Sequence, residues 1–339
     1  MKNRPLKIVF AVFFSLLLLV GLAIVLIPEL QVRNEAYQIQ QFVDEWEDKV
    51  QNGEFSQTGD ISVPDENISS EPGPVLPELL HDMSEYNQQI FENGQSGLVD
   101  AWSYQTDVFD LTVYGIENDV AGIITIPKIN IELPLYLGAS YDNLTKGFAQ
   151  LSQTSMPIGG EGTNCVVACH RGWRGMAYMR DVELLGEGDS VFVQNIWDIL
   201  EYRVKEAIVI KPHEIENIYI QPGRDLLTIA TCHPYGVGSH RYLLICERYQ
   251  PEEAGNLNET LPKPKEEDRA KAPVNDNINI TTSDGAAFVS SQPQIFLQTY
   301  FPWLCLSFVV GVLLIVVVSS LLSYVRRRKQ YNFKYLRKK

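Results

Sequence analysis

The chain has few basic residues outside its two ends, and this shortage excludes one broad class of partner. Eleven of its 28 basic residues lie in the short tails 1–7 and 326–339, which contain no acidic residue. The rest of the sequence therefore carries 17 basic against 42 acidic residues. Because such a surface repels phosphate groups, we expect no nucleic-acid partner.

The sequence also lacks the paired cysteine motifs of a structural metal site. Its five cysteines stand at positions 165, 169, 232, 246 and 305, with no C-x-x-C pair and no EF-hand loop elsewhere. We therefore predict no structural zinc and no bound cofactor, while a calcium site among the many acidic residues stays open. The spacing is not that of a small disulfide scaffold, although a bridge from Cys246 to Cys165 or Cys169 stays open. Cys305 lies in an apolar run, where packing is its simplest role.

Charged residues are absent from two long apolar runs, 8–27 and 303–325. Each run is long enough to cross a bilayer as a helix, which takes about 20 residues. Because short basic flanks stay in the cytoplasm, we predict a two-pass protein of the cell membrane, with both termini inside and the intervening region outside. The alternative for the first run is a cleaved signal peptide, but its apolar core is usually about 7–15 residues, and no small-x-small site follows Ile27.

The residues between the two runs change character near position 120. Residues 30–50 and 79–91 have helical periodicity, and the polar, proline-containing stretch 51–77 separates them. Seven short β-rich runs follow, with glycine and proline turns between them: 120–126, 131–136, 164–168, 190–194, 200–210, 225–230 and 241–246. This pattern predicts a mainly β fold, a closed or nearly closed β-barrel of about eight strands with short helices.

The predicted organisation has seven segments. Residues 251–302 are acidic and rich in proline, asparagine, serine and threonine, which is typical of a disordered linker. The full order is a cytoplasmic tail 1–7, a transmembrane helix 8–27, an extracellular helical and lid region 28–119, a catalytic barrel 120–250, the linker 251–302, a transmembrane helix 303–325 and a basic cytoplasmic tail 326–339.

Three residues of the barrel region have the chemistry of nucleophilic attack on a carbonyl. Such a reaction needs a thiolate, a proton-transfer partner and a positive group for the developing oxyanion, which Cys232, His170 and Arg241 supply. Arginine remains charged at any working pH, and its forked donors suit a carbonyl oxygen. Cys232 and Arg241 are nine positions apart across a Pro-Tyr-Gly turn. We therefore expect two antiparallel strands to bring them to the same end of the sheet.

The short sequence motifs around these residues resemble those of the sortase family. Thr228-Ile-Ala-Thr-Cys232 is similar to the sortase signature Thr-Leu-x-Thr-Cys, with isoleucine in place of leucine, while His170-Arg171-Gly172 and His240-Arg241 resemble its histidine loop and arginine strand. The resemblance implies a sortase-type barrel. It also implies a cysteine transpeptidase that cuts an LPXTG-like sorting signal through a Cys232 thioester, with His170 as acid and base, Arg241 at the carbonyl oxygen and Thr231 in support.

The subclass depends on a shorter motif. Pilin-joining (class C) sortases carry a second, C-terminal anchor and a lid with an Asp-Pro-aromatic motif. The stretch Asp100-Ala101-Trp102 resembles this lid, with alanine in place of proline, which leaves the backbone dihedral φ unfixed. By resemblance, Asp100 approaches Arg241, and Trp102 covers Cys232. The implied partners are pilin or surface-protein substrates, and a pilin lysine amine accepts the acyl group.

Two other functions compete with pilin joining. A sortase of another class anchors surface proteins and takes a peptidoglycan amine as acceptor. A membrane-tethered binding module on a sortase-like barrel has no catalytic activity. In such a module we expect the cysteine, histidine and arginine to have been lost, yet all three are present. Hydrolysis of the thioester is a related outcome when no amine arrives.

Overall fold

The computed structural model of the chain describes residues 4–56, 75–104, 109–116, 118–250, 280–285 and 287–336. The chain divides into two units, residues 1–291 and 292–339.

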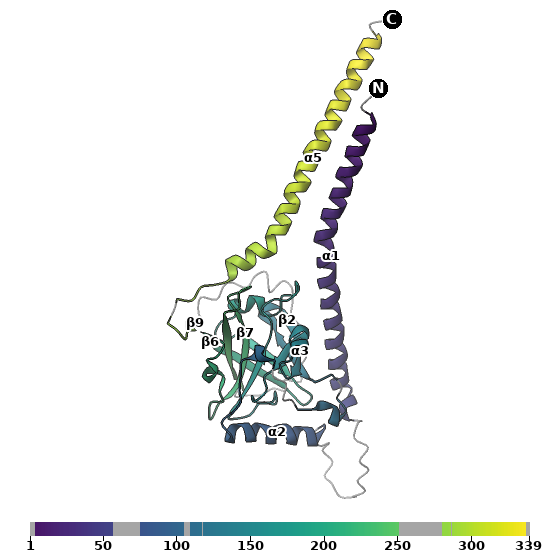
Figure 1. Cartoon of the computed structure of the whole chain (residues 1–339). Helices are drawn as coiled ribbons and strands as arrows, with labels where there is room; N and C mark the ends of the chain where they lie inside the picture. Colours follow the sequence, from purple (N-terminus) through teal and green to yellow (C-terminus); the bar gives the residue numbers. More distant parts are fainter. Residues whose placement is uncertain are drawn as a thin grey trace. The chain divides into compact units, whose positions relative to one another are not determined.

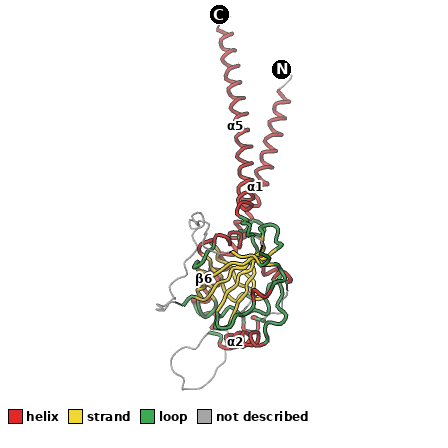
Figure 2. The backbone as a smooth tube through the Cα atoms, turned by 90° about the vertical axis from the view of Figure 1, so that its left-hand side faces the viewer, coloured by secondary structure: helices red, strands yellow, loops and turns green. Residues whose placement is uncertain are grey.

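The first unit contains a closed β-barrel (Figures 1 and 2). Its eight strands run in the order β5-β1-β2-β3-β4-β7-β8-β6, and the pairing of β5 with β6 closes the ring. The bounds are β1 Val120–Ile126, β2 Ile131–Leu137, β3 Phe148–Gln150, β4 Thr163–Ala168, β5 Ser190–Gln194, β6 Ile199–Ile210, β7 Asp225–His233 and β8 His240–Arg248. The predicted mainly β fold with a closed barrel of about eight strands is confirmed.

Two short strands are missing from the sequence-based prediction. β3 has three residues and pairs with β2 and β4. A ninth strand, β9 (Ile280–Thr282), runs parallel to residues 207–209 of β6, on backbone that β5 does not reach. β9 and the start of the following helix at residue 292 lie inside the predicted disordered linker 251–302, so that prediction is wrong for this part. Residues 251–279 lie outside the described range.

Helices surround the barrel of the first unit. They are α1 Arg4–Gln51, α2 Pro77–Glu92 and α3 Tyr141–Lys146, with short 3-10 turns η1 Glu54–Ser56, η2 Ala101–Ser103, η3 Leu111–Tyr114, η4 Pro127–Ile129, η5 Tyr178–Leu184 and η6 Ile215–Ile218. α2 begins with a proline, which suits a first turn. It buries Leu79, Met83 and Ile90 along one face and crosses one end of the barrel (Figure 1). Residues 57–74 of the polar stretch 51–77 are not among those described.

The second unit consists of helix α5, Gln292–Leu336, which is longer than the predicted span 303–325. Among the described residues, the stretch Gln292–Val312, with a mean hydropathy of 1.7, is long and apolar enough to cross a membrane. The first predicted span, 8–27, lies within α1, which continues unbroken past Pro28 to Gln51. The side chains of residues 4–18 are outside the described set, so the first anchor stays a prediction.

The barrel interior settles the question of a disulfide. Cys165 and Cys246 both pair with Leu227, from the two strands that flank β7. Two strand spacings of about 4.8 Å place their backbones farther apart than the roughly 7 Å that a disulfide spans. Cys169 lies four residues beyond Cys165, past the end of β4, and is also unbridged. All five cysteines are free. The buried cysteines at 165, 169 and 246 are core residues, and burial raises the pKa of each thiol.

Candidate active site

Cys232 and Arg241 are direct partners in the antiparallel pairing of β7 with β8. The register places them one pair away from His233 and His240, where the two strands diverge into the turn 234–239. Directly opposite residues of an antiparallel pair have Cβ atoms about 4.5–5.5 Å apart. The predicted approach of these two residues at one end of the sheet is therefore present in the structure.

His170 reaches the same end of the barrel from β4. β4 runs parallel to β7 with Ala168 opposite Ala230, and the amide of Cys169 still donates to the Ala230 carbonyl at 3.1 Å. His170 thus follows the end of its strand by the same number of residues that separates Cys232 from Ala230. The parallel register brings the histidine loop to the level of the cysteine.

The imidazole of His170 is buried and held by stacking. Its ring lies parallel to that of Trp173, with centroids 4.6 Å apart, and its Nε2 has no hydrogen-bond partner among the described residues. Burial lowers the pKa of His170 below its usual value, so the ring is neutral at neutral pH. In the tautomer that carries its proton on Nδ1, this neutral ring can accept a proton at Nε2.

The Cys232 thiol is partly exposed and resists ionisation. Burial is the main cause that raises its pKa, and the carboxylate of Asp100 raises it further, while the charges of Arg241 and Arg171 act in the opposite direction. The net direction is upward. At rest the site therefore holds a neutral thiol rather than a thiolate.

Arg241 is occupied by the segment around residue 100. Its Nε and Nη2 donate to the two carboxylate oxygens of Asp100 at 2.8 and 2.7 Å, which is a bidentate pair. The ring of Trp102 lies over the same guanidinium, with its centroid 4.3 Å from Cζ. The contact expected for Asp100 is thus present, and the contact found for Trp102 is with Arg241, while the expected cover of Cys232 by Trp102 stays a prediction.

Thr231 connects the cysteine strand to the histidine loop. Its side chain is fully buried, and Oγ1 donates to the Cys169 carbonyl at 2.8 Å. The hydroxyl therefore supports the site through the backbone that precedes His170.

Sequence reasoning missed three residues that surround this site. Trp173 stacks on His170, and Arg171 forms a buried ion pair with Glu183. Arg171 stands inside the quoted His-Arg-Gly motif, so its position was a usable signal. Nothing in the local sequence distinguishes Glu183 from a solvent-exposed acid.

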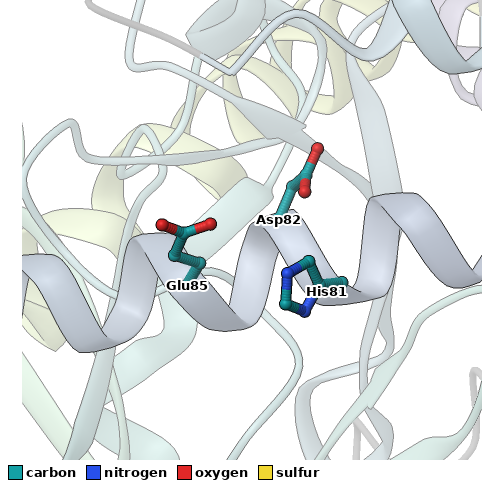
Figure 3. A group of neighbouring side chains, drawn as sticks. All are labelled: His81, Asp82 and Glu85. Atoms are coloured by element: carbon teal, nitrogen blue, oxygen red, sulfur yellow. The ribbon is translucent and has the colours of Figure 1, made fainter.

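A possible cation-binding group lies elsewhere, on α2. His81, Asp82 and Glu85 have ligand atoms within 4.8 Å of one another (Figure 3), but Asp82 also accepts a hydrogen bond from the hydroxyl of Tyr114. Two of the three side chains are exposed, and such groups are common on protein surfaces without a metal. The group shares no element with Cys232, His170 or Arg241.

Comparison with known proteins identifies the family. A family model described as Sortase domain matches residues 124–249. The Streptococcus agalactiae sortase C1 structure (Type II) is 30% identical, and the match covers 53% of this chain and 92% of that chain, with a TM-score of 0.49. The chain belongs to the sortase family. Its sortase domain contains Cys232, His170 and Arg241, whereas Asp100 and Trp102 precede it.

Two further relatives show how far the similarity extends. Sortase D of Bacillus subtilis (strain 168) is 27% identical over 131 residues, which are 38% of this chain and 63% of the relative. The chain thus spans less than two thirds of that curated sortase. A structure described as a pilus-related sortase C of Group B Streptococcus is 28% identical, covering 51% of this chain and 91% of that one, with a TM-score of 0.46.

Proposed function

We propose that this sortase is a membrane-anchored cysteine transpeptidase that cleaves an LPXTG-like sorting signal and joins the acyl product to a lysine amine of a pilin subunit. The observation that carries the proposal is the placement of Cys232 opposite Arg241 on β7 and β8, with His170 at the matching level beyond β4. Thiol, imidazole and guanidinium are the three groups that acyl transfer requires.

The reaction begins with the attack of Cys232 Sγ on the carbonyl carbon of the Thr–Gly bond. His170 takes the thiol proton and passes it to the glycine nitrogen as the C–N bond breaks, which leaves a thioester and a free amine. An incoming amine then attacks the thioester carbonyl and gives its proton to His170. The C–S bond breaks as the new amide forms, and His170 returns the proton to the sulfur, which regenerates the thiol. Arg241 donates hydrogen bonds to the carbonyl oxygen as negative charge develops on it in both steps.

The resting protonation states determine when the nucleophile forms. The pKa of Cys232 is raised and that of His170 is lowered, so the neutral pair is the main form at neutral pH. Proton transfer from the thiol to the imidazole therefore accompanies the attack or immediately precedes it. Loss of the Asp100 charge lowers the thiol pKa, so an opened lid favours the thiolate.

Pilin joining is favoured over other sortase reactions by the contacts of Asp100 and Trp102. Both engage Arg241, the group that the substrate carbonyl needs, so this segment acts as a lid that the substrate must displace. A C-terminal apolar helix is the second feature that resembles the pilin-joining class. In this proposal, the barrel lies outside the cell, and both chain termini lie in the cytoplasm.

A wall-anchoring sortase is the principal rival, and the acceptor amine distinguishes the two. The full chain, purified in detergent, is incubated with an LPXTG peptide and either a lysine-containing pilin peptide or a peptidoglycan stem-peptide amine. Pilin joining predicts product with the lysine peptide. Product only with the peptidoglycan amine supports wall anchoring, and release of the cleaved acid alone supports hydrolysis. The non-catalytic binding module predicts no acyl adduct on Cys232 with any sorting peptide.

A further inference from the structure

A short segment near the end of the first unit packs against residues that border the candidate active site. This segment, residues 287–291, is called the strap below. The Ser290 hydroxyl donates to Glu183 at 2.6 Å, and the Ser291 amide donates to both oxygens of the same carboxylate at 3.1 and 3.0 Å. The strap lies 38 residues beyond the end of the family match at residue 249 when counted to its first residue, 287.

Glu183 connects the strap to the histidine loop. Its carboxylate pairs with the Arg171 guanidinium, and the two side chains are only 3% and 1% exposed. Burial raises the pKa of Glu183, but the charge of Arg171 and the hydrogen bonds from Ser290 and Ser291 outweigh it, and the net direction is downward. The buried carboxylate therefore stays charged and binds three partners at once.

Arg171 extends this connection to the cysteine strand. Its Nη1 lies 2.8 Å from His233 Nδ1 and donates to the Cys232 carbonyl at 3.4 Å. The pKa of His233 is lowered to about 4, first by burial and then by the Arg171 charge, so its neutral ring can accept the hydrogen bond. One arginine beside His170 thus holds the backbone of the residue that carries the thiol.

The strap also holds the loop that follows Cys232. Ser291 Oγ accepts a hydrogen bond from the Tyr235 amide at 3.1 Å. The ring of Phe288 stacks on His233, with centroids 5.4 Å apart and planes at 22°, and meets Tyr242 edge-on. The strap therefore contacts both ends of the turn between Cys232 and Arg241, through His233 and Tyr235 on one side and Tyr242 on the other.

We propose that the strap, Glu183 and Arg171 form a positioning unit for the nucleophile, so that the sortase domain 124–249 needs residues 287–291 to hold Cys232 in its reactive place. This inference rests on the proposed role of Cys232. Arg171 and Glu183 act through the backbone and the local charge and touch no substrate. A soluble fragment that ends near residue 250 lacks the strap and leaves Glu183 without two of its three partners.

Alkylation of Cys232 tests the unit without any sorting peptide. The full chain in detergent carries Cys305→Ser, because Cys305 is exposed while the other three cysteines are buried. The rate of reaction with iodoacetamide is measured against pH for Glu183→Gln, Arg171→Met and Ser291→Ala. Ser283→Ala is the matched control, since its hydroxyl contacts Glu214 near β9. Thermal unfolding of each variant is recorded beside the alkylation rates.

The two charge variants are expected to move the alkylation midpoint in opposite directions. The Arg171 charge lowers the pKa of the Cys232 thiol, so its loss is expected to raise that pKa. Loss of the Glu183 charge leaves Arg171 without its counter-charge and is expected to lower the thiol pKa. Ser291→Ala is expected to speed hydrogen exchange at the Tyr235 amide by about 2- to 10-fold, while Ser283→Ala leaves it unchanged. With a sorting peptide, each charge variant is expected to lower kcat by about 10- to 100-fold.

The outcomes separate this inference from the proposed function. Opposite midpoint shifts with faster exchange at Tyr235 support the positioning unit, even when no peptide is turned over. Midpoints that stay at the wild-type value, or that move together as thermal stability falls, overturn it and leave Arg171 and Glu183 as stabilising residues only. Because Arg171→Met leaves a buried carboxylate unpaired, Ser291→Ala decides the case when that variant does not fold: wild-type exchange at Tyr235 then overturns the proposal.

Discussion

The lid and the strap are two segments outside the sortase domain that meet the same site in different ways. Asp100 and Trp102 of the proposed lid contact the side chain of Arg241, the group that we propose binds the substrate carbonyl. Ser291 of the strap contacts a buried carboxylate and a backbone amide, which have no proposed contact with substrate. In this proposal the lid competes with substrate, whereas the strap supports the site with or without it.

The two carboxylates that these segments involve also differ in solvent exposure. The Asp100 carboxylate is 21% exposed and the Glu183 carboxylate 3%. Partly exposed ion pairs contribute little to stability and exchange readily for other partners, while removal of one member of a buried pair is costly. We therefore expect the contact of Asp100 with Arg241 to open reversibly and the contacts of the strap with Glu183 to persist.

The largest expected effect is on the strap side, at Glu183. Glu183→Ala leaves the Arg171 charge buried without its partner, and we expect the free energy of unfolding to fall by about 3–5 kcal/mol. The pKa of Glu183 is lowered in the folded state, so its contribution is present at neutral pH and is lost as the pH falls through the folded-state pKa. Chemical denaturation of the full chain at several pH values measures this.

The control for Glu183 is the exposed acid Glu187 on the following turn. Glu187→Ala is expected to change the free energy of unfolding by no more than about 0.5 kcal/mol. Equal effects of the two substitutions contradict the assignment of Glu183 as a buried, charged residue that holds several partners.

Arg241 is where lid and substrate compete, and its loss is expected to have the next largest effect. Arg241→Lys keeps the charge but removes the forked donors, so kcat is expected to fall by about 10²- to 10³-fold. Arg248→Lys, at the other end of β8, serves as the control in the same peptide-cleavage assay. A fall of the same size in both variants argues against a role for Arg241 at the carbonyl oxygen.

Asp100→Ala is expected to move the alkylation midpoint of Cys232 in the same direction as Glu183→Gln and opposite to Arg171→Met. It frees Arg241 and removes a negative charge that raises the pKa of Cys232, so the alkylation midpoint shifts to lower pH. The alkylation rate at neutral pH is expected to rise by about tenfold. Asp110→Ala, a loss of the η3 cap, is the matched control; an unchanged midpoint in Asp100→Ala contradicts the lid model.

Trp102→Ala is expected to have the smallest effect. A cation–π contact at a partly exposed site is worth roughly 0.5–1 kcal/mol, so the alkylation rate is expected to rise by about 2- to 5-fold. Labelling of the Cys305→Ser background with and without this substitution gives the ratio. Equal rates show that the tryptophan does not restrict access to Cys232, and leave the Asp100 contact as the lid's means of closure.

The sequence predicted the barrel and the reactive residues because both have short-range signals. The longer strands show apolar, β-branched runs bounded by turn residues, and Cys232, His170 and Arg241 stand inside recognisable motifs. β3 and β9 were missed because three residues give no periodicity. Their pairing depends on neighbours far apart in the chain, which a local pattern does not contain.

The positioning unit could not be found in the same way. Ser290, Ser291 and Phe288 lie in a polar region whose composition is typical of a disordered linker, and Glu183 resembles any surface acid. The partners of the three strap residues lie 46 or more residues away in the chain, the nearest being Tyr242, which contacts Phe288, and only the fold brings them together. The contact of Trp102 with Arg241 was missed for a related reason, since the motif names the residue but not its neighbour.

Cys232 is proposed to be the nucleophile that accepts the acyl group, and an intact-mass measurement tests this role directly. The full chain in detergent is incubated with an LPXTG peptide without acceptor amine, and its intact mass is followed in wild type, Cys232→Ala and Cys305→Ser. We expect a mass increase equal to the acyl part of the peptide in wild type and Cys305→Ser, and none in Cys232→Ala. An adduct that persists in Cys232→Ala would contradict this role. The absence of any adduct across a panel of variant signals, in wild type and in Asp100→Ala, where the lid is open, would contradict it as well.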